Sequence, residues 1–211
     1  IPVALGLHIP KRYDKILDIS ECLIQDPVCN DILDLVKDVV YEMNLNAWDI
    51  RKHTGFLRNL VIRKGFNTGE IMLNFVTSEY KDDALVLMVQ LCRERFPEIT
   101  SIVNNITRRH SGSTQGEKEF VLYGKPYLNE KLGEFTFEIS ANSFFQTNTN
   151  QAEKLYGIIK DECSLTGNEI VYDLFCGTGS ISIFLANNAR EVYGFELVPS
   201  AVSDAEHNAR I

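Results

Sequence analysis

The sequence predicts an α/β protein, in which a central α+β domain is followed by the first half of a doubly wound parallel sheet. Three observations support this prediction. Residues 3–140 combine short strand patterns with two amphipathic helix patterns, whereas residues 169–209 alternate strand, helix, strand and helix. Between the first strand and helix of that alternation, Gly177 and Gly179 mark a tight turn, the place where a doubly wound sheet binds its ligand.

The composition limits the classes of protein to which this chain can belong. With 211 residues, of which 45% are hydrophobic and 24% charged, the chain can form one large or two small packed domains. No secretory signal and no apolar run of about 18 residues occur, so no membrane association is expected. Five cysteines without a C-x-x-C pair favour reduced thiols and a cytoplasmic location. The net charge of -8 does not favour loose binding of nucleic acid, although a local patch can differ.

The first domain begins with short extended segments at residues 5–9 and 15–19. Apolar residues then recur at helical spacing over residues 28–43, and Asp26 with Pro27 suits the start of this helix. Strands are expected next at residues 47–50, 57–63, 70–76, 101–107, 119–123 and 135–140, with a second amphipathic helix at residues 85–96, a turn at residues 65–69 and a polar loop at residues 111–118.

The second domain has a different pattern. Asn148 with Gln151 resembles a capping pair, and an apolar stripe over residues 152–159 predicts the helix that follows. A strand, a helix, a strand and a helix are then expected at residues 169–174, 180–188, 191–196 and 199–209. We therefore divide the chain into residues 1–143 and residues 144–211.

The glycine turn lies between two acidic strand ends. Asp173 ends the strand before it, and Glu196 ends the next strand, where its carboxylate can accept two hydrogen bonds from a ribose diol. Two cofactors suit such a crevice, a dinucleotide and S-adenosylmethionine. The dinucleotide fingerprint needs a third glycine, where this sequence has Ser182, and Asp173 would repel a pyrophosphate. S-adenosylmethionine is cationic and is therefore favoured over a nicotinamide cofactor, with a turn that binds no ligand as the structural alternative.

Several stretches carry a likeness to one family. They read FEISANSFFQTNTNQAEKLY, YDLFCGTGSISIFLA and VYGFELVPSAVSDAEHNA within residues 135–209, with HTGFLRNLVIRKG at 53–65 and DISECLIQDP at 18–27. Together they resemble the RNA uracil-5-methyltransferases, which make 5-methyluridine in ribosomal or transfer RNA. The S-F-F-Q-x-N run before the cofactor domain is the most specific of these elements, because many methyltransferases share the D-x-x-x-G-x-G turn.

The resemblance implies a three-part protein, with a small N-terminal β-barrel, a central α/β domain and a C-terminal Rossmann-like methyltransferase domain. This chain would supply the central domain and the first half of the last, and we expect it to be an inactive fragment. In the family, a cysteine thiolate adds to C6 of uracil, C5 takes the methyl group, and a base removes the C5 proton. The nucleophile and the base would lie beyond Ile211.

The resemblance also implies the site residues. Gln146 and Phe175 match cofactor contacts, the alternatives being an exposed capping glutamine and a core phenylalanine. Ser180 would face the ligand or simply open its helix. The cofactor-binding set is therefore predicted to be Gln146, Phe175, Gly177, Gly179, Ser180 and Glu196.

RNA contacts are expected in the first domain and just ahead of the second. Phe144 and Phe145 are adjacent, so only one can point into a core, and by family analogy Phe144 stacks on an RNA base. The basic stretch at residues 51–64 contains no acid and suits phosphate contact, unless it is only a solvated strand face. The predicted phosphate contacts are Arg51, Arg58 and Arg63, with Arg108, Arg109 and His110 as a second basic group.

Two cysteines lie at positions that have a role in the family. Cys176 lies in the cofactor turn, but this place belongs to cofactor binding in the family, so we interpret it as a buried thiol rather than the nucleophile. Cys22 matches a fourth ligand of the [4Fe-4S] cluster that some members hold, and the other three cysteines would precede Ile1. No metal site is expected within this chain itself.

Two alternatives to RNA uracil methylation stay open. One is a class I methyltransferase with a different substrate, and the other is a non-catalytic RNA-binding module. The sequence does not distinguish ribosomal from transfer RNA as the target, and it leaves the modified uridine and the oligomeric state open.

Overall fold

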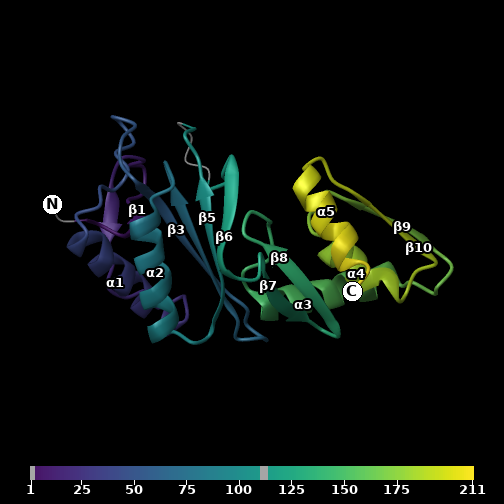
Figure 1. Cartoon of the computed structure of the whole chain (residues 1–211). Helices are drawn as coiled ribbons and strands as arrows, with labels where there is room; N and C mark the ends of the chain where they lie inside the picture. The colour runs from purple at the N-terminus through teal and green to yellow at the C-terminus, as the bar shows by residue number, and fades with distance from the viewer. Residues whose placement is uncertain (1–2, 110–113) are drawn as a thin grey trace. The chain divides into compact units, whose positions relative to one another are not determined.

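The computed structural model describes residues 3–109 and 114–211, which form a mixed α/β structure as the sequence predicts (Figure 1). The chain divides into two compact units. The first unit comprises residues 1–64 and 71–126, and the second comprises residues 65–70 and 127–211. His110 and residues 111–113 of the predicted polar loop lie outside the described residues. Within the described ranges, no helix is long and apolar enough to cross a membrane.

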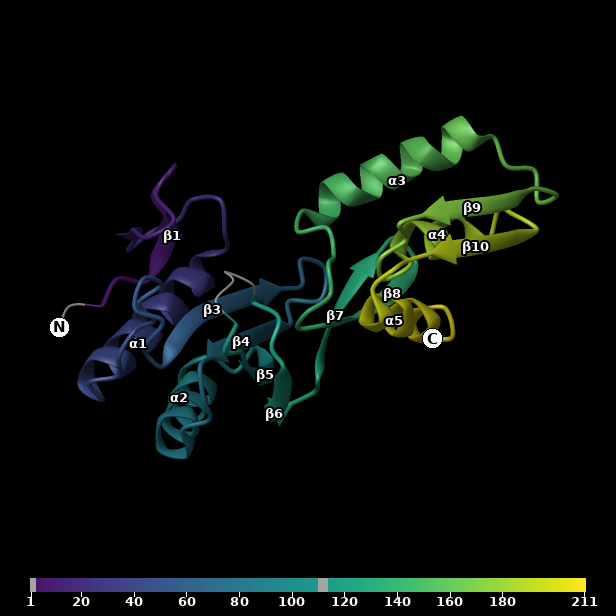
Figure 2. The ribbon, with the colours of Figure 1, turned by 90° about the horizontal axis from the view of Figure 1, so that it is seen from above.

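The first unit is built on a four-stranded sheet in the order β3-β4-β5-β6. Its strands are β3 (Leu57–Lys64), β4 (Ile71–Thr77), β5 (Ile99–Ile106) and β6 (Lys118–Gly124). β4 and β5 are parallel and are joined through helix α2 (Asp82–Arg95), while the two outer strands run antiparallel to their neighbours. Helices α1 (Pro27–Glu42) and α2 lie on the same side of this sheet (Figure 2).

The core of the first unit lies between the sheet and the two helices. Leu73 and Phe75 of β4 are fully buried against Ile32 and Val36 of α1 and Met88 of α2. Each such side chain contributes about 1.5–3 kcal/mol when it is fully buried. The Asp26 side chain accepts a hydrogen bond from the Val28 N–H at 3.1 Å and so caps α1 as predicted.

A small hairpin precedes α1, formed by the two segments that the sequence predicts to be extended. β1 (Gly6–His8) pairs antiparallel with β2 (Ile16–Asp18), and residues 9–15 form the turn between them. The predicted strand at residues 47–50 is wrong, because this segment makes only isolated bridges, at Ala47 and Asp49. The Asp49 side chain accepts hydrogen bonds from the backbone of Arg51 and Lys52, so the chain turns back before a strand can extend.

The second unit starts with an antiparallel pair, β7 (Tyr127–Leu132) and β8 (Phe135–Ser140), followed by helix α3 (Thr149–Cys163). The sequence predicts β8 and α3 but not β7. Asn148 caps α3, since its side chain accepts from the Gln151 N–H at 3.1 Å. The small core of this unit contains Leu132, Phe137, Ile139, Phe145, Ala152 and Tyr156.

The unit continues with β9 (Ile170–Leu174), α4 (Ser180–Ala186), β10 (Glu191–Phe195) and α5 (Pro199–Asn208). β9 and β10 are parallel, with Leu174 opposite Phe195, which confirms the expected alternation. The first compact unit ends at Pro126, earlier than the sequence division after residue 143, because β7 and β8 pack with α3. The division into two family domains stays a prediction.

Candidate functional site

The turn between β9 and α4 has an unusual backbone. Phe175, Gly177 and Gly179 all adopt positive φ, at 67°, 57° and 79°. This conformation costs glycine little but strains a bulky residue such as Phe175. The N–H groups of Phe175 and Cys176 both donate to the Phe195 carbonyl, at 2.8 and 3.0 Å, so the turn is fixed to the end of β10. Strain held by fixed partners is typical of a ligand-binding turn.

Glu196 connects this turn to the helix that follows β10. Its Oε2 accepts from the Gly177 N–H at 3.1 Å, and its Oε1 accepts from the N–H groups of Leu197 at 2.8 Å and Val198 at 2.9 Å. The backbone hydrogen bonds from Val198, Gly177 and Leu197 lower the pKa of Glu196. Glu196 is therefore held as an anion directly beside the glycine turn.

Asp173 adds a second negative charge near the same turn. Its Oδ2 accepts a hydrogen bond from the Ser182 hydroxyl at 2.7 Å, so Ser182, which replaces the third fingerprint glycine, orients this carboxylate. Burial raises the pKa of the Cys176 thiol, and the charges of Asp173 and Glu196 raise it further. The turn therefore has a negative potential, and Cys176 is kept protonated, which argues against a nucleophilic role.

The turn is open enough to receive a ligand. A Cβ added at Gly177 would meet no atom within 4 Å, and the Phe175 side chain is 87% exposed. The predicted core alternative for Phe175 is therefore not what the structure shows. An open bend beside two carboxylates fits a cationic group, so the residues present suit S-adenosylmethionine better than a pyrophosphate.

Helix α5 supports the turn from behind, which the sequence interpretation missed. The Asn208 side chain donates to the Thr178 carbonyl at 3.4 Å and to the Glu138 carbonyl of β8 at 3.2 Å. A Cβ at Gly179 would approach the Ala205 Cβ to 3.2 Å, so α5 packs closely there. The only signal in the sequence was that these residues lie within the family-like stretch ending in AEHNA.

Helix α3 contacts Ser180, another residue of the predicted cofactor-binding set. The buried Tyr156 hydroxyl lies 2.9 Å from the Ser180 hydroxyl, and sequence periodicity identified Tyr156 only as a core position. Ser180 is thus a positioned helix start whose hydroxyl is already paired.

The S-F-F-Q run lies between β8 and α3. Phe145 is buried, with its ring centroid 5.6 Å from that of Phe137, whereas Phe144 is 72% exposed. The adjacent pair therefore splits as predicted, with one ring in the core and one outside. Gln146 is exposed. Its role in cofactor binding stays a prediction.

The three arginines predicted to contact RNA lie in different settings. Arg51 is exposed and pairs with Asp14. Arg58 is half-buried; its guanidinium lies 4.0 Å from the Trp48 ring centroid and donates to the carbonyl of Thr107 at 3.1 Å. Arg63 is also half-buried, and burial lowers its pKa.

The structure does not bring these three arginines together. Arg58 and Arg63 are five positions apart on β3, which is about 17 Å at the usual rise of a strand. Arg108 and Arg109 follow β5, and the Arg109 carbonyl accepts from Arg58 at 2.8 Å, so this second basic group lies beside Arg58 instead.

The described residues do not form a metal centre. Cys22 is half-buried in the segment before α1, and its N–H donates to Asn30 Oδ1 at 3.0 Å. In the parts of the chain that the structure describes, no group of three or more His, Cys, Asp or Glu residues could hold a metal ion, and the five cysteines are free. These residues therefore lack the four thiolates of an iron–sulfur cluster. The role of Cys22 as one ligand of such a cluster stays a prediction.

Comparison with known proteins gives a consistent answer. A family model described as tRNA (uracil-5-)-methyltransferase matches residues 74–211. An uncharacterized RNA methyltransferase of Chlorobaculum tepidum is 40% identical over 209 residues, which are 99% of this chain and 43% of that protein. Another, of Staphylococcus aureus, is 39% identical over 209 residues, covering 99% of this chain and 46% of its own length. The chain therefore spans less than half the length of these curated relatives.

A solved structure agrees with the sequence relatives. The tRNA (uracil-54, C5)-methyltransferase of Pyrococcus abyssi, in complex with S-adenosyl-L-homocysteine, has a TM-score of 0.79 and 30% sequence identity to this chain. The similarity covers 97% of this chain and 48% of the Pyrococcus chain. Because the family model matches well over half of its residues, the chain belongs to the tRNA (uracil-5-)-methyltransferase family.

Proposed function

We propose that the full-length protein methylates C5 of uracil in RNA with S-adenosylmethionine as the methyl donor. The observation that carries this proposal is the open glycine turn between two carboxylates, with Glu196 bonded to the Gly177 N–H at 3.1 Å and Asp173 beside it. A sulfonium and an ammonium group are attracted by such a turn, whereas a phosphate is repelled.

The two units would have different tasks in this reaction. β9, α4, β10 and α5 would be the first half of a doubly wound Rossmann-like methyltransferase domain, and the first unit would be the central, RNA-facing domain. The nucleophile and the base are expected in the part of the full-length protein outside this chain. A cytoplasmic location, and Cys22 as one ligand of a cluster completed elsewhere, belong to the same proposal.

S-adenosylmethionine, when bound, supplies the methyl group. The residues of this chain would hold it: Glu196 would accept from a ribose hydroxyl with the lone pair that its three backbone donors leave, and the bend at Gly177 and Gly179 lets the backbone approach. The exposed Phe144 would stack on a base that has left the RNA helix. In the overall exchange, C5 gains a bond to the methyl carbon and loses its proton to a base, after a thiolate has added to C6 and before it leaves.

The proposal is tested by following the C5 hydrogen. RNA with tritium at C5 of uracil is incubated with the full-length protein and S-adenosylmethionine. One tritium should enter water for every methyl group transferred, because the C5 proton must leave before the thiolate can. Transfer RNA and ribosomal RNA transcripts, assayed in parallel, identify which class of RNA is the substrate.

A matched pair of variants links the activity to the turn. Glu196→Gln should raise the KM for S-adenosylmethionine by about tenfold or more, since a charge-assisted acceptor is removed. Glu191→Gln makes the same chemical change at the other end of β10 and should leave this KM unchanged. Methyl transfer without tritium release would contradict the proposal and indicate a different methyltransferase. RNA binding without any methyl transfer would indicate a non-catalytic module.

A further inference from the structure

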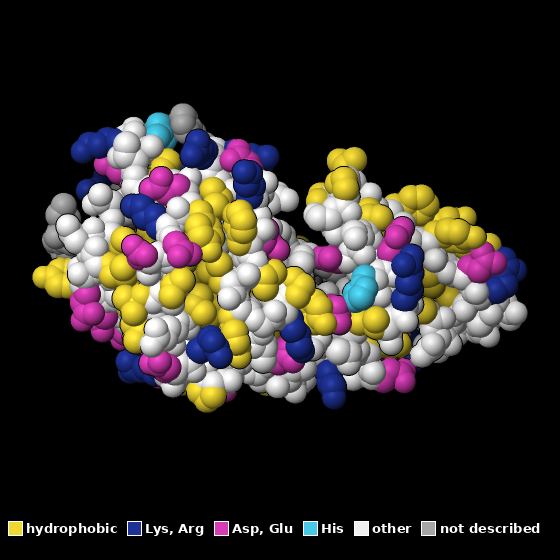
Figure 3. Space-filling model, in the orientation of Figure 1, with side chains coloured by type: hydrophobic (Ala, Val, Ile, Leu, Met, Phe, Trp, Pro, Cys, Tyr) yellow, Lys and Arg dark blue, Asp and Glu magenta, His cyan; other side chains and the backbone are white. Residues whose placement is uncertain are grey.

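Basic side chains gather at one end of the first unit, where the β1–β2 turn, the start of β3 and the end of β5 meet. Figure 3 shows dark-blue Lys and Arg side chains together with a histidine at the upper end of this unit. We call this surface the basic end. It consists of six exposed cations: Lys11, Arg12, Arg51, Lys52, Arg108 and Arg109.

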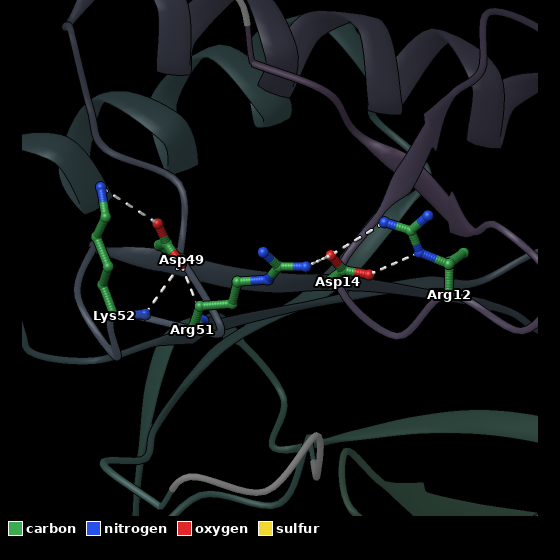
Figure 4. Close-up of polar contacts among 5 residues, drawn as sticks. All are labelled: Arg12, Asp14, Asp49, Arg51 and Lys52. Atoms are coloured by element: carbon green, nitrogen blue, oxygen red, sulfur yellow. Dashed lines mark hydrogen bonds and ion pairs between the residues drawn. The ribbon is translucent and has the colours of Figure 1, made fainter.

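A shared carboxylate holds two of these cations together. Asp14 accepts from the Arg12 Nε at 3.1 Å and also pairs with Arg51, so it joins the β1–β2 turn to the loop before β3 (Figure 4). The Asp14 side chain is only 5% exposed, whereas those of Arg12 and Arg51 are 53% and 66% exposed. The anion is therefore covered, and the remaining guanidinium N–H groups face solvent.

Arg58 supports the same end from inside. Its guanidinium stacks on Trp48 and donates to the carbonyls of Thr107 and Arg109, which fixes the segment after β5 beside the loop before β3. Arg58 is thus a support for the basic end, although the sequence interpretation placed it among the phosphate contacts. Its donors are directed at backbone carbonyls, whereas Arg51 pairs with the Asp14 carboxylate and its side chain is 66% exposed.

The charges of this surface oppose those of the whole chain. Three carboxylates pair with four of these cations: Asp14 with Arg12 and Arg51, Asp49 at 3.8 Å from Lys52, and Glu117 at 3.5 Å from Arg109. The surface therefore keeps a positive excess on a chain whose net charge is -8. An excess that survives such an overall charge is a specific feature of the surface and not a consequence of composition.

We propose that the basic end binds the phosphodiester backbone of the RNA substrate and that Asp14 is a positioning residue that holds Arg12 and Arg51 as a pair. This inference rests on the proposed function, whose RNA substrate it assigns to a surface. Two planar guanidinium groups fixed side by side suit successive phosphate oxygens, because each presents a rigid fork of donors. Interactions of this kind set the register of the RNA without reading its sequence.

The test measures the affinity of the full-length protein for a fluorescein-labelled single-stranded RNA by anisotropy at several salt concentrations. The double variant Arg12→Gln, Arg51→Gln should bind about tenfold more weakly. The magnitude of the negative slope of log K for RNA binding against log salt concentration should also fall by about 1.4, which is about 0.7 for each phosphate that the variant no longer neutralises. The control Lys154→Gln, Lys160→Gln removes the same charge from α3 and should leave both values unchanged. Equal losses of affinity in both double variants would overturn the proposal.

The role of Asp14 gives a second test with opposite outcomes. If Asp14 only offsets positive charge, Asp14→Asn should tighten RNA binding, and that result would refute the positioning role. If it holds the two arginines as a pair, the same variant should weaken binding although it adds net positive charge. A melting temperature close to that of the parent protein shows whether Asp14→Asn remains folded. If Asp14→Asn does not fold, Arg51→Lys replaces it as the test. This variant keeps the positive charge but loses the planar fork of donors, so it should also weaken RNA binding.

Two further measurements distinguish a failure of this proposal from a failure of the proposed function, and distinguish binding of the RNA backbone from binding of free phosphate. Weak RNA binding by the arginine variant should raise the KM for RNA and leave kcat for tritium release unchanged. Salt-dependent RNA binding at the basic end without any tritium release would refute the proposed function and leave the surface standing. Inorganic phosphate, compared with chloride at equal ionic strength, should compete weakly; strong competition would show a site for a single anion and overturn assignment to the RNA backbone.

Discussion

At the scale of single residues, the candidate site depends on carboxylates with several backbone partners. Glu196 accepts three backbone hydrogen bonds, which use most of the lone pairs that a carboxylate offers. It therefore orders the turn before any ligand arrives, and a ribose diol would extend an existing network. Order of this kind lowers the entropy that binding must otherwise remove.

The lowered pKa of Glu196 predicts how cofactor binding depends on pH. A carboxylate whose folded pKa lies below its unfolded value stabilises the fold at pH above the unfolded value, about 4.3 for glutamate. This stabilisation is lost as pH falls through the lower, folded pKa. Because Glu196 stays ionised below its ordinary pKa, it can still accept hydrogen bonds from the ligand there. Affinity for S-adenosylhomocysteine, measured by calorimetry on the full-length protein, should therefore persist below about pH 4.3. A midpoint above the ordinary glutamate pKa would contradict this.

A buried carboxylate gives a second residue-scale prediction. Glu130 is 2% exposed and accepts hydrogen bonds from the backbone of Asn67 at 3.0 Å and from the Thr149 hydroxyl at 2.8 Å. Glu130→Gln places an amide donor against these donors and should destabilise the protein by about 1–3 kcal/mol. Chemical denaturation measures this loss of stability. The surface change Glu134→Gln should cost far less, and equal effects would show that Glu130 is not a structural acceptor.

At the scale of elements, sequence periodicity locates helices well and one strand poorly. α1, α2 and α3 are predicted because apolar residues recur on one face of each. β7 is missed because its inward positions are Leu128, Glu130 and Leu132, and the buried Glu130 breaks the apolar alternation. The residues 47–50 look extended, but the Asp49 side chain bonds to the backbone two and three positions ahead and closes a turn. At residues 47–50, side-chain hydrogen bonds to the backbone therefore override the extended propensity.

The cap of α1 gives an element-scale prediction with a built-in control. Asp26 accepts from the Val28 N–H and pairs with Lys64 of β3, and these contacts, the one with Lys64 foremost, lower its pKa. Asp26→Ala should destabilise the protein by about 1 kcal/mol, because the cap is removed. Asp26→Asn keeps the cap and removes only a partly exposed ion pair, so it should cost less. Equal losses of stability in urea denaturation would place the stabilisation in the ion pair instead.

At the scale of the whole molecule, the sequence predicts the mixed α/β fold class, the family and the place of the glycine turn. These features follow from local spacing, since a strand, two glycines and a second acidic strand end are all visible along the chain. It does not reveal which arginines meet, because Arg58 is directed inward by Trp48 and by carbonyls about 50 positions away in sequence. The same limit hides Tyr156 and Asn208, whose partners are distant along the chain.

The most direct measurement is hydrogen–deuterium exchange in the full-length protein, with and without S-adenosylhomocysteine. Amides of residues 175–179 and 196–198 should exchange more slowly when the ligand is present, because they surround the open turn and the Glu196 carboxylate. NAD at the same concentration should leave their exchange unchanged. Unchanged exchange at this turn under conditions that saturate the protein with S-adenosylhomocysteine, or equal protection by NAD, would contradict a methyl-donor site between these two strand ends.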